Sequence, residues 1–390
     1  LIGAEGVFLL YSRSQTEGQR LLTCIPAMLL CYWCFGYGAW LCLALMLAAG
    51  IIAHHQKLSA LLAAGILLLP ATQYPATTWW SKPDLDREYV LSLDVEHYFG
   101  NIQKMRKHLE TDRQILWVSY YRNLYNATHP SEINSPVSLS RNLLAWNQPG
   151  TNGLILPVNP SASFLSILFA NELWFTLGDM TMAEHCAMLS MIFSPRNSGS
   201  RMIKRLAEIN LVNGDDEAAL KYLRILDKTL LHKSWAEKRI PGQQTPRVKE
   251  WLEKKRRDIP TQDHLRSGND AVTSLRNLVA SNAGNLRAYE YLLCYHLLSK
   301  DLRSFVEDYV PGKVSSSIFA EALLIHLARQ GNIRAEELIK YQIPVKIAKE
   351  FADYTRLYEA KDTSLKEKYG KTYWFYYHFA TTEPGKESKP

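Results

Sequence analysis

The distribution of apolar and charged positions changes abruptly near residue 80. Only five charged side chains lie in residues 1–80, and the other 78 of the 83 lie beyond that point. An uncharged run of 33 residues at 21–53 exceeds the about 20 apolar residues that cross a bilayer as a helix. The pattern predicts a membrane region at 1–80 with spans near 27–52 and 58–78. A tight double span inside the first run is the alternative, and a buried hairpin of a water-soluble protein is disfavoured.

The first residues resemble the tail of an earlier span rather than a secretory signal. The chain starts at Leu1, with no basic segment ahead of an apolar core. We therefore expect a C-terminal fragment of a larger multi-pass protein. Two arginines in the loop at 12–20, with Lys82 and Arg87 after the second span, outnumber Lys57 on the opposite side. By the positive-inside rule, this difference favours a cytoplasmic location for the polar domain.

Beyond residue 80, apolar residues recur three and four positions apart, as on one face of an α-helix. This spacing occurs in five stretches, at 198–213, 215–226, 270–281, 286–298 and 318–329. Gly or Asn-Gly closes several of these helices, and Asp or Asn begins the next. Strand-type alternation is scarce. The pattern predicts an all-α fold class, in which transmembrane helices are followed by an α-solenoid of tetratricopeptide-like type.

The spacing of the helix-ending glycines indicates a repeat. Gly178 and Gly214 lie 36 residues apart, and residues 201–226 resemble a tetratricopeptide repeat, a helix–turn–helix unit. Ala207 and Ala219 occupy the small positions of this unit. We therefore expect both alanines to be buried where two antiparallel helices meet, with the turn at Gly214. An irregular helical bundle with accidental spacing is the alternative to the solenoid.

Composition divides the polar part of the chain into segments. These are a first helical repeat-like segment at 81–127, a Pro/Ser/Asn-rich connection at 128–163, a tetratricopeptide-like helical region at 164–368, an aromatic cap at 369–379 and a polar tail at 380–390. The connection carries Leu154, Ile155 and Leu156, which favour a packed crossover over a flap on the solenoid. The aromatic segment is expected to pack on the helix at 346–358 rather than at a bilayer interface, because an exposed aromatic tail would be sticky.

The net charge of +7 does not by itself indicate a nucleic-acid partner. The densest basic run, at 247–258, has six basic and three acidic residues, with Trp251 as its one aromatic residue. A solvated helix face is favoured over contact with lipid headgroups, and nucleic-acid binding is disfavoured. Cys31 and Cys34 match a redox C-x-x-C motif by spelling, but their apolar setting favours cysteine as a small apolar filler.

No catalytic, cofactor-binding or metal-binding residue is predicted, and no cofactor is expected. The sequence has neither a G-x-x-x-x-G-K-[ST] phosphate loop nor an H-E-x-x-H zinc motif. His54 and His55 are adjacent and so point to different helix faces, which favours a solvated pair over a metal or haem site. His185 and His232 have no partner at metal-ligand spacing. The sequence alone leaves open whether the chain is an enzyme.

Four phrases carry a resemblance to a known family: RLAEINLVNG, AALKYLRIL, LLHKSWAE and YGKTYWFYYHF. Together with the apolar spans, they resemble an uncharacterised family of bacterial multi-pass membrane proteins with a tetratricopeptide-like C-terminal region. The resemblance covers most of the chain. It implies a location in the bacterial inner membrane and further N-terminal spans, and it supplies no catalytic residues.

These observations favour a membrane-anchored helical-repeat scaffold that binds a protein or peptide partner in the groove of its repeats. Membrane lipid is the second expected partner. The alternative function is an accessory C-terminal domain of a membrane enzyme, such as a lipid-linked glycan transferase, whose catalytic part lies outside this fragment. The scaffold is favoured because nothing in the sequence pairs titratable groups for catalysis.

Overall fold

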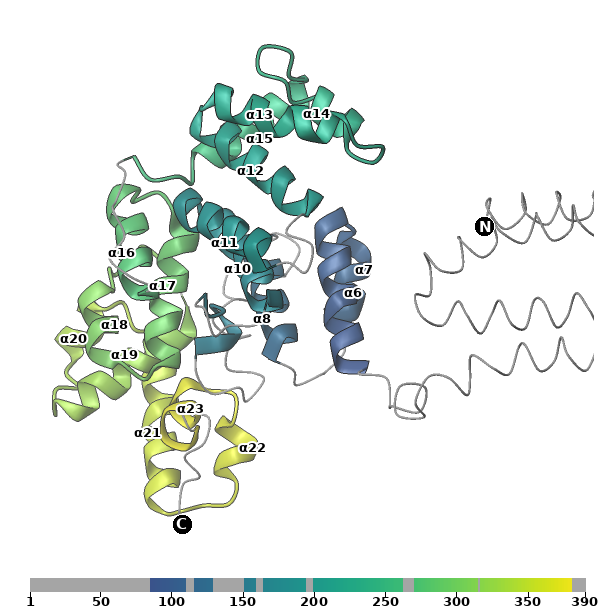
Figure 1. Cartoon of the computed structure of the whole chain (residues 1–390). Coiled ribbons are helices and arrows are strands. Elements are labelled where there is room, and N and C mark those ends of the chain that lie inside the picture. The colour runs from purple at the N-terminus through teal and green to yellow at the C-terminus, as the bar shows by residue number, and fades with distance from the viewer. Residues whose placement is uncertain are drawn as a thin grey trace, which may run out of the picture. The chain divides into compact units, whose positions relative to one another are not determined.

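The computed structural model describes residues 85–109, 116–128, 151–158, 164–193, 199–261, 270–314 and 316–380. The chain divides into two compact units, Leu1–Leu85 and Asp86–Pro390, and the described residues belong almost entirely to the second. Within the described ranges every regular element is a helix and no strand occurs, which confirms the predicted all-α class (Figure 1). The elements are α6 (Leu85–Phe99), α7 (Ile102–Leu109), α8 (Leu116–Thr128), the 3₁₀ turn η2 (Thr151–Gly153), α10 (Phe164–Leu177), α11 (Met180–Phe193), α12 (Ser200–Asn213), α13 (Asp216–Asp227), α14 (Lys233–Glu237), α15 (Pro246–Arg256), α16 (Ala271–Ser281), α17 (Leu286–Leu298), α18 (Leu302–Asp308), α19 (Ser317–Arg329), α20 (Ala335–Lys340), α21 (Val345–Glu359), α22 (Leu365–Tyr369) and α23 (Tyr373–Phe379).

None of the helices in these ranges has the length and apolarity that a bilayer crossing requires. The longest of them, α6 and α21, have 15 residues each, fewer than the about 20 that span the hydrocarbon core. This finding corrects the predicted multi-pass membrane protein, the transmembrane part of its predicted fold and its predicted inner-membrane location. The spans predicted near 27–52 and 58–78, and the span tail before them, lie outside the described residues.

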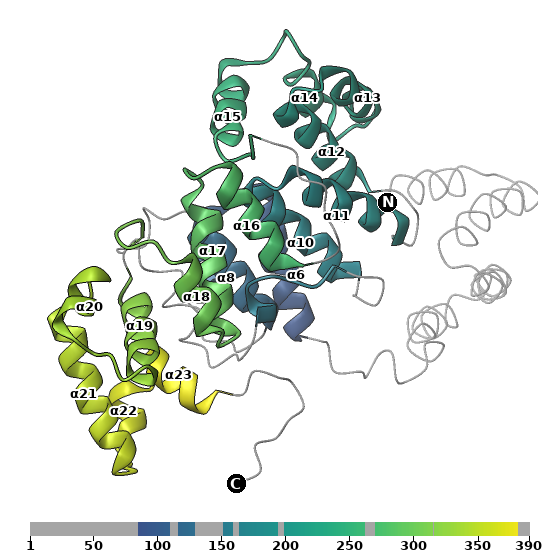
Figure 2. The same ribbon diagram turned by 90° about the vertical axis from the view of Figure 1, so that its left-hand side faces the viewer.

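Helices that follow one another along the chain pack against one another. α10 packs on α11, α11 on α12 and α12 on α13, and later in the chain α16 packs on α17, α17 on α18 and α18 on α19 (Figure 2). Contacts between helices further apart in the sequence join α12 to α15, and α19 to α21 and α23. The apolar side chains form one main core cluster, which extends from Val90 in α6 to Tyr376 in α23.

The α12–α13 hairpin shows why the chain turns where it does. Gly214 ends α12 with a φ of 81°, a conformation that glycine adopts without a Cβ penalty. Asp215 then begins α13, and its side chain accepts a hydrogen bond from the backbone N–H of Ala218. Ala207 and Ala219 are fully buried where the two helices pack. The helix–turn–helix predicted at 201–226 is confirmed.

A close junction joins the α10–α11 turn to the end of α15 and the start of α17. Gly178 has a φ of +89°, and a Cβ placed on it would lie 2.3 Å from the carbonyl oxygen of Asp258. The Nδ2 of Asn285 donates hydrogen bonds to the carbonyls of Leu177, at 2.7 Å, and Asp258, at 2.8 Å. The same side chain accepts from the backbone N–H of Ala288 and so begins α17. One buried asparagine therefore holds three helices together.

The described part of the predicted connection is packed against α8. Leu154, Ile155 and Leu156 are buried, and the Nδ2 of Asn123 donates to the carbonyl of Gly153 at 2.9 Å. This packing agrees with the crossover predicted from the same leucines and isoleucine. The rest of the connection lies outside the described residues, and the predicted segment boundaries stay predictions.

The aromatic segment near the C-terminus is covered by α19 and α21. Tyr373 and Trp374 are buried, and the ring centroid of Trp374 lies 5.3 Å from that of Phe351 in α21. The backbone N–H of Tyr373 donates to the carboxylate of Glu321 at 2.6 Å, and the indole N–H of Trp374 donates to the Glu321 carbonyl at 2.9 Å. The contact with α21 is the one expected for this segment from the sequence.

Candidate functional site

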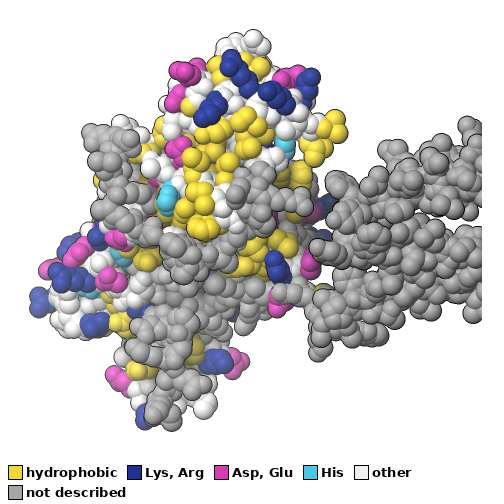
Figure 3. All heavy atoms as spheres, in the orientation of Figure 1, with side chains coloured by type: hydrophobic (Ala, Val, Ile, Leu, Met, Phe, Trp, Pro, Cys, Tyr) yellow, Lys and Arg dark blue, Asp and Glu magenta, His cyan; other side chains and the backbone are white. Residues whose placement is uncertain are grey.

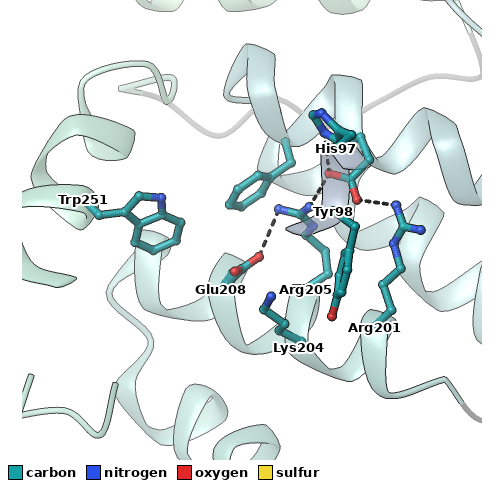
Figure 4. A pocket seen from close by; sticks show the side chains of 9 residues that line it. His97, Tyr98, Arg201, Lys204, Arg205, Glu208 and Trp251 are labelled. Atoms are coloured by element: carbon teal, nitrogen blue, oxygen red, sulfur yellow. Dashed lines mark hydrogen bonds and ion pairs between the residues drawn. The ribbon is translucent and has the colours of Figure 1, made fainter. Parts of the chain in front are cut away.

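A cavity of about 200 Å³ lies between α6, α10, α12 and α15 (Figure 4). Cations, carboxylates and aromatic rings line it, and several of these side chains keep partial exposure, so the cavity opens to the surface. The lining residues are His97, Tyr98, Glu172, Phe175, Arg201, Lys204, Arg205, Glu208 and Trp251. We call this cavity the basic pocket.

Helix α12 supplies four of the lining residues from one face. Arg201, Lys204, Arg205 and Glu208 stand at positions i, i+3, i+4 and i+7, which align along one side of an α-helix. The apolar side of the same helix is buried, as at Leu206. Burial of the apolar side therefore turns the charged side toward α6 and α10.

Glu172 is the buried anion that organises the pocket. Its carboxylate is the one charged group of the apolar helix α10, and its side chain is 6% exposed. Arg205 donates to it at 2.5 Å and Arg201 at 2.9 Å, and His97 Nε2 lies 3.5 Å from Oε2. Burial alone would raise the pKa of Glu172, but Arg205, the hydrogen bond from His97 and Arg201 hold it well below its usual range.

A second buried carboxylate, that of Asp94 in α6, orients Arg201. The guanidinium donates to the Asp94 carboxylate from both terminal nitrogens, at 2.6 Å and 2.8 Å. The hydroxyl of Tyr121 donates to Oδ1 of the same carboxylate at 2.5 Å. Two parallel N–H···O bonds of this kind fix the orientation of the guanidinium and also pair its charge. Burial and the charge of Asp94 raise the pKa of Tyr121, so this tyrosine stays a donor. Arg201 thus ties α12 to both α6 and α10.

Lys204 lies between two aromatic rings at the other side of the pocket. Its Nζ is 4.6 Å from the ring centroid of Tyr98 and 5.1 Å from that of Trp235 in α14. The guanidinium of Arg239 lies over the same Trp235 ring at 4.1 Å. Cations are attracted to the faces of aromatic rings, so these rings hold two cations near each other without neutralising them.

Phe175 of α10 receives two further cations. Arg205 lies 3.9 Å from its ring centroid, and the Nζ of Lys255 in α15 lies at 4.5 Å. Trp251 stacks on the same ring with the centroids 6.3 Å apart. The aromatic rings of the pocket therefore keep its positive charges apart from one another.

Three of these cations have no carboxylate within ion-pair distance in the described part of the chain: Lys204, Arg239 and Lys255. Burial lowers the pKa of Lys204, and that of Lys255 to about 8. Arg205 adds to both shifts by repulsion between like charges. Positive charges are thus held close together at a half-buried place, where each is costly until an anion joins them.

The pocket is suited to hold an anion rather than a metal cation. Glu172 and Glu208 are already bound to arginines, with Glu208 Oε2 3.0 Å from Arg205 Nη1. No group of three or more His, Cys, Asp or Glu side chains that could hold a metal ion occurs within the described ranges. On the surface over α13–α15, acidic and basic side chains are interspersed (Figure 3).

Two residues of the basic run at 247–258 differ from the predicted solvated face. Lys255 lies against Phe175 and points its Nζ to within 3.4 Å of that residue's carbonyl. Arg256 donates to the carbonyls of Val212, at 3.0 Å, and Leu211, at 2.7 Å. These carbonyls are at the C-terminal end of α12, where a helix lacks internal donors. The run therefore binds α15 to α10 and α12.

The other residues weighed from the sequence lie apart from the pocket's lining. Cys186 and Cys294 are buried. His185 is exposed on α11, and His232 precedes α14. Burial lowers the pKa of His232, and Lys204 adds to this shift. His54, His55, Cys31 and Cys34 lie outside the described residues.

Sequence reasoning missed the residues of the basic pocket because they come from four helices. Two local signals were present. Glu172 is a lone charge in the otherwise apolar stretch of α10, which marks a buried ion that needs a partner. Arg201, Lys204, Arg205 and Glu208 form a charged stripe opposite the apolar face of their helix. Neither signal names the partner helix, so the pocket itself could not be assembled from the sequence.

Comparison with known proteins places the chain in a family. Residues 59–380 match the family of unknown function DUF6057. Because the match covers most of the chain, the chain belongs to this family. No curated protein and no solved structure matches the chain. The resemblance to an uncharacterised family is confirmed to this extent, and the match does not bear on the membrane or tetratricopeptide-like parts of that resemblance.

Proposed function

We propose that this chain is a helical-repeat scaffold that binds a protein or peptide partner, and that an acidic side chain of the partner enters the basic pocket. The observation that carries the proposal is that Lys204, which lines the pocket, and Arg239 and Lys255, which lie beside it, have no carboxylate partner among the described residues. Opposite charge on a partner removes the cost of crowding them.

The finer fold assignment belongs to the same proposal. We infer a tetratricopeptide-like α-solenoid, because consecutive helices pack on their neighbours from α10 to α13 and again from α16 to α19. The α12–α13 hairpin has the small buried alanines and the glycine turn that such a unit uses. Solenoids present extended surfaces that serve as binding sites for other chains.

The size of the pocket supports a side chain as its occupant. Its volume is about 200 Å³, below the roughly 300–1,000 Å³ of sites that enclose a small molecule. It is far larger than the roughly 10–15 Å³ that a single water needs. A partner's acidic side chain, with its remaining chain on the surrounding surface, fits this volume better than a whole metabolite does.

The test compares acidic and neutral peptides on the full chain. Fluorescence anisotropy with pools of short labelled peptides, identical except for a central Glu or Gln, should show tighter binding of the Glu pool. Lys204→Gln should abolish this preference, and higher salt should weaken it, because exposed charges are screened over a Debye length of about 10 Å at 0.1 M.

Lys254→Gln is the matched control. Lys254 is exposed on α15, one residue before Lys255, and does not line the pocket. This variant should bind both pools as the parent chain does. A Glu pool that binds no better than the Gln pool, or a preference that survives in Lys204→Gln, contradicts the proposed function.

A further inference from the structure

The charges in and beside the basic pocket do not balance. Five cations gather there, and they are Arg201, Lys204, Arg205, Arg239 and Lys255. Three carboxylates oppose them, from Asp94, Glu172 and Glu208. The surplus is two positive charges. A single carboxylate from a partner would neutralise only one of them.

We propose that the group bound in the basic pocket is the dianion of a phosphate monoester, carried on a phosphorylated side chain of a protein or peptide partner. This inference rests on the proposed function and names the chemistry of its ligand. A phosphorylated Ser, Thr or Tyr carries a charge of about −1.5 to −2 near neutral pH and three acceptor oxygens. Its charge therefore matches the surplus that the chain leaves in the pocket.

Unused donors occur on residues of the pocket and beside it. The Nε atoms of Arg201 and Arg239 are buried and have no hydrogen-bond partner among the described residues. Lys204 contributes three N–H donors and lies between the rings of Tyr98 and Trp235. Buried donors that lack partners are costly, and a tetrahedral group with three acceptors can satisfy several of them at once.

The fixed partners of Arg201 and Arg205 prepare the pocket before the ligand arrives. Arg201 is held by Asp94 at 2.6 Å and Arg205 by Glu172 at 2.5 Å, so neither guanidinium can fold away from the site. Glu208 occupies Nη1 of Arg205 at 3.0 Å and is itself part-exposed. An incoming dianion competes with this carboxylate, whereas Glu172 stays beneath as the buried counter-ion.

The titration of the two lysines supports the same ligand. Burial lowers the pKa of Lys204, with Arg205 and Arg239 adding to the shift and Glu208 and Glu172 opposing it. Burial likewise lowers the pKa of Lys255, with Arg205 and Arg287 adding to the shift and Asp258 and Glu208 opposing it. A dianion beside these amines would favour their charged forms. Its binding would therefore offset the repulsion among the neighbouring positive charges.

The experiment uses the full chain and three pools of short labelled peptides that differ only at the central residue. That residue is phosphoserine, glutamate or serine. Fluorescence anisotropy should give a dissociation constant for the phosphoserine pool at least about tenfold below that for the glutamate pool. The binding of inorganic phosphate is measured as well, so that recognition of a phosphorylated side chain can be distinguished from recognition of free phosphate.

Two substitutions act in opposite directions, which separates binding from folding. Lys204→Gln should remove the preference for phosphoserine, whereas Glu208→Gln should strengthen it, because that change removes a competing carboxylate. Lys254→Gln, outside the pocket, should leave all three dissociation constants unchanged. Circular dichroism checks that each variant is folded, and the gain expected in Glu208→Gln cannot come from a damaged fold.

Each other outcome is decisive. Equal affinity for phosphoserine and glutamate overturns the phosphate inference and leaves the proposed function intact. Binding of inorganic phosphate without binding of the phosphoserine pool overturns the assignment to a phosphorylated partner. If neither charged pool binds better than the serine pool, both this inference and the proposed function fail.

Discussion

A single carboxylate, that of Glu172, determines whether the basic pocket keeps its arrangement. Arg201 and Arg205 both donate to it from α12, and it is 6% exposed. Burial of a charge in a helix as apolar as α10 is tolerated because the two guanidiniums compensate it. At the scale of one residue, therefore, the pocket and the stability of the fold depend on the same group.

Glu172→Gln should destabilise the chain by about 3–5 kcal/mol, the usual cost of removing one partner of a buried ion pair. Urea unfolding measures this loss, and Glu253→Gln on the exposed side of α15 should change stability by no more than about 0.5 kcal/mol.

The contribution of Glu172 should also depend on pH, because its pKa is depressed in the folded chain. Its contribution is therefore present above the unfolded pKa of about 4.3 and is lost as pH falls through the folded value. Equal unfolding midpoints for the two variants would contradict this role.

Lys255 should make stability rise with pH in the alkaline range. Burial lowers its pKa in the folded chain to about 8, whereas an unfolded lysine has a pKa of about 10.4. Between these values the unfolded chain binds more protons, so raising the pH favours the folded form. Urea midpoints of the parent chain relative to Lys255→Met should increase from about pH 8 to about pH 10. A constant difference between the two across that range would show that Lys255 titrates as an exposed lysine does.

At the scale of elements, two glycines that look alike in the sequence have different structural roles. Gly178 and Gly214 each end a helix with a positive φ, of +89° and +81°. A Cβ on Gly214 would meet nothing within 4 Å, whereas one on Gly178 would lie 2.3 Å from the carbonyl of Asp258. The first glycine satisfies the backbone alone, and the second also permits the close approach of α15.

Gly178→Ala should therefore cost more stability than Gly214→Ala. Both variants carry the left-handed penalty of about 1–2 kcal/mol, and the clash at Asp258 should add roughly 1–3 kcal/mol to the first. Thermal unfolding of the two variants side by side measures the difference. If they lose equal stability, the junction of α10, α15 and α17 yields to the added methyl group, and its tightness is not needed for the fold.

The same contrast shows how much of the fold the sequence predicts. The α12–α13 hairpin follows from local chemistry, because Gly214, Asp215 and the alanines act within one turn or one helix pair. The basic pocket does not, because Asp94 and Arg201 meet across 107 residues of chain. Periodicity shows that α12 has a charged face, but only packing decides what that face meets. The inner-membrane prediction rested on the composition of residues 1–80, and it is corrected because no helix of the described ranges is long and apolar enough to cross a bilayer.

At the scale of the described unit, the last helix joins three others. In α23, Tyr373 donates its hydroxyl to the carbonyl of Leu297 at 3.0 Å, and Tyr376 donates to that of Leu298 at 2.9 Å. Trp374 packs on α21 and donates to the Glu321 carbonyl in α19. The carbonyls of α17 that accept these bonds are at its C-terminal end, where the helix itself supplies no donors, and that of Leu297 also accepts from the backbone N–H of Lys300. α23 therefore completes α17 while it covers α19 and α21.

Trp374→Ala should loosen helices that lie far from it in the sequence. Removal of a buried tryptophan costs about 3–5 kcal/mol, and because α23 satisfies the end of α17, its loss should speed hydrogen–deuterium exchange in α17, α19 and α21. Exchange in α12 and α13, which have no hydrogen bond or ring contact with α23 among the described residues, should be unchanged and serves as the internal control. Phe379→Ala, at a ring that is 51% exposed, is the matched variant and should have a much smaller effect. Should exchange in α17 stay at the parent rate in Trp374→Ala, α23 would be an appendage that covers apolar surface without stabilising the helices beneath it.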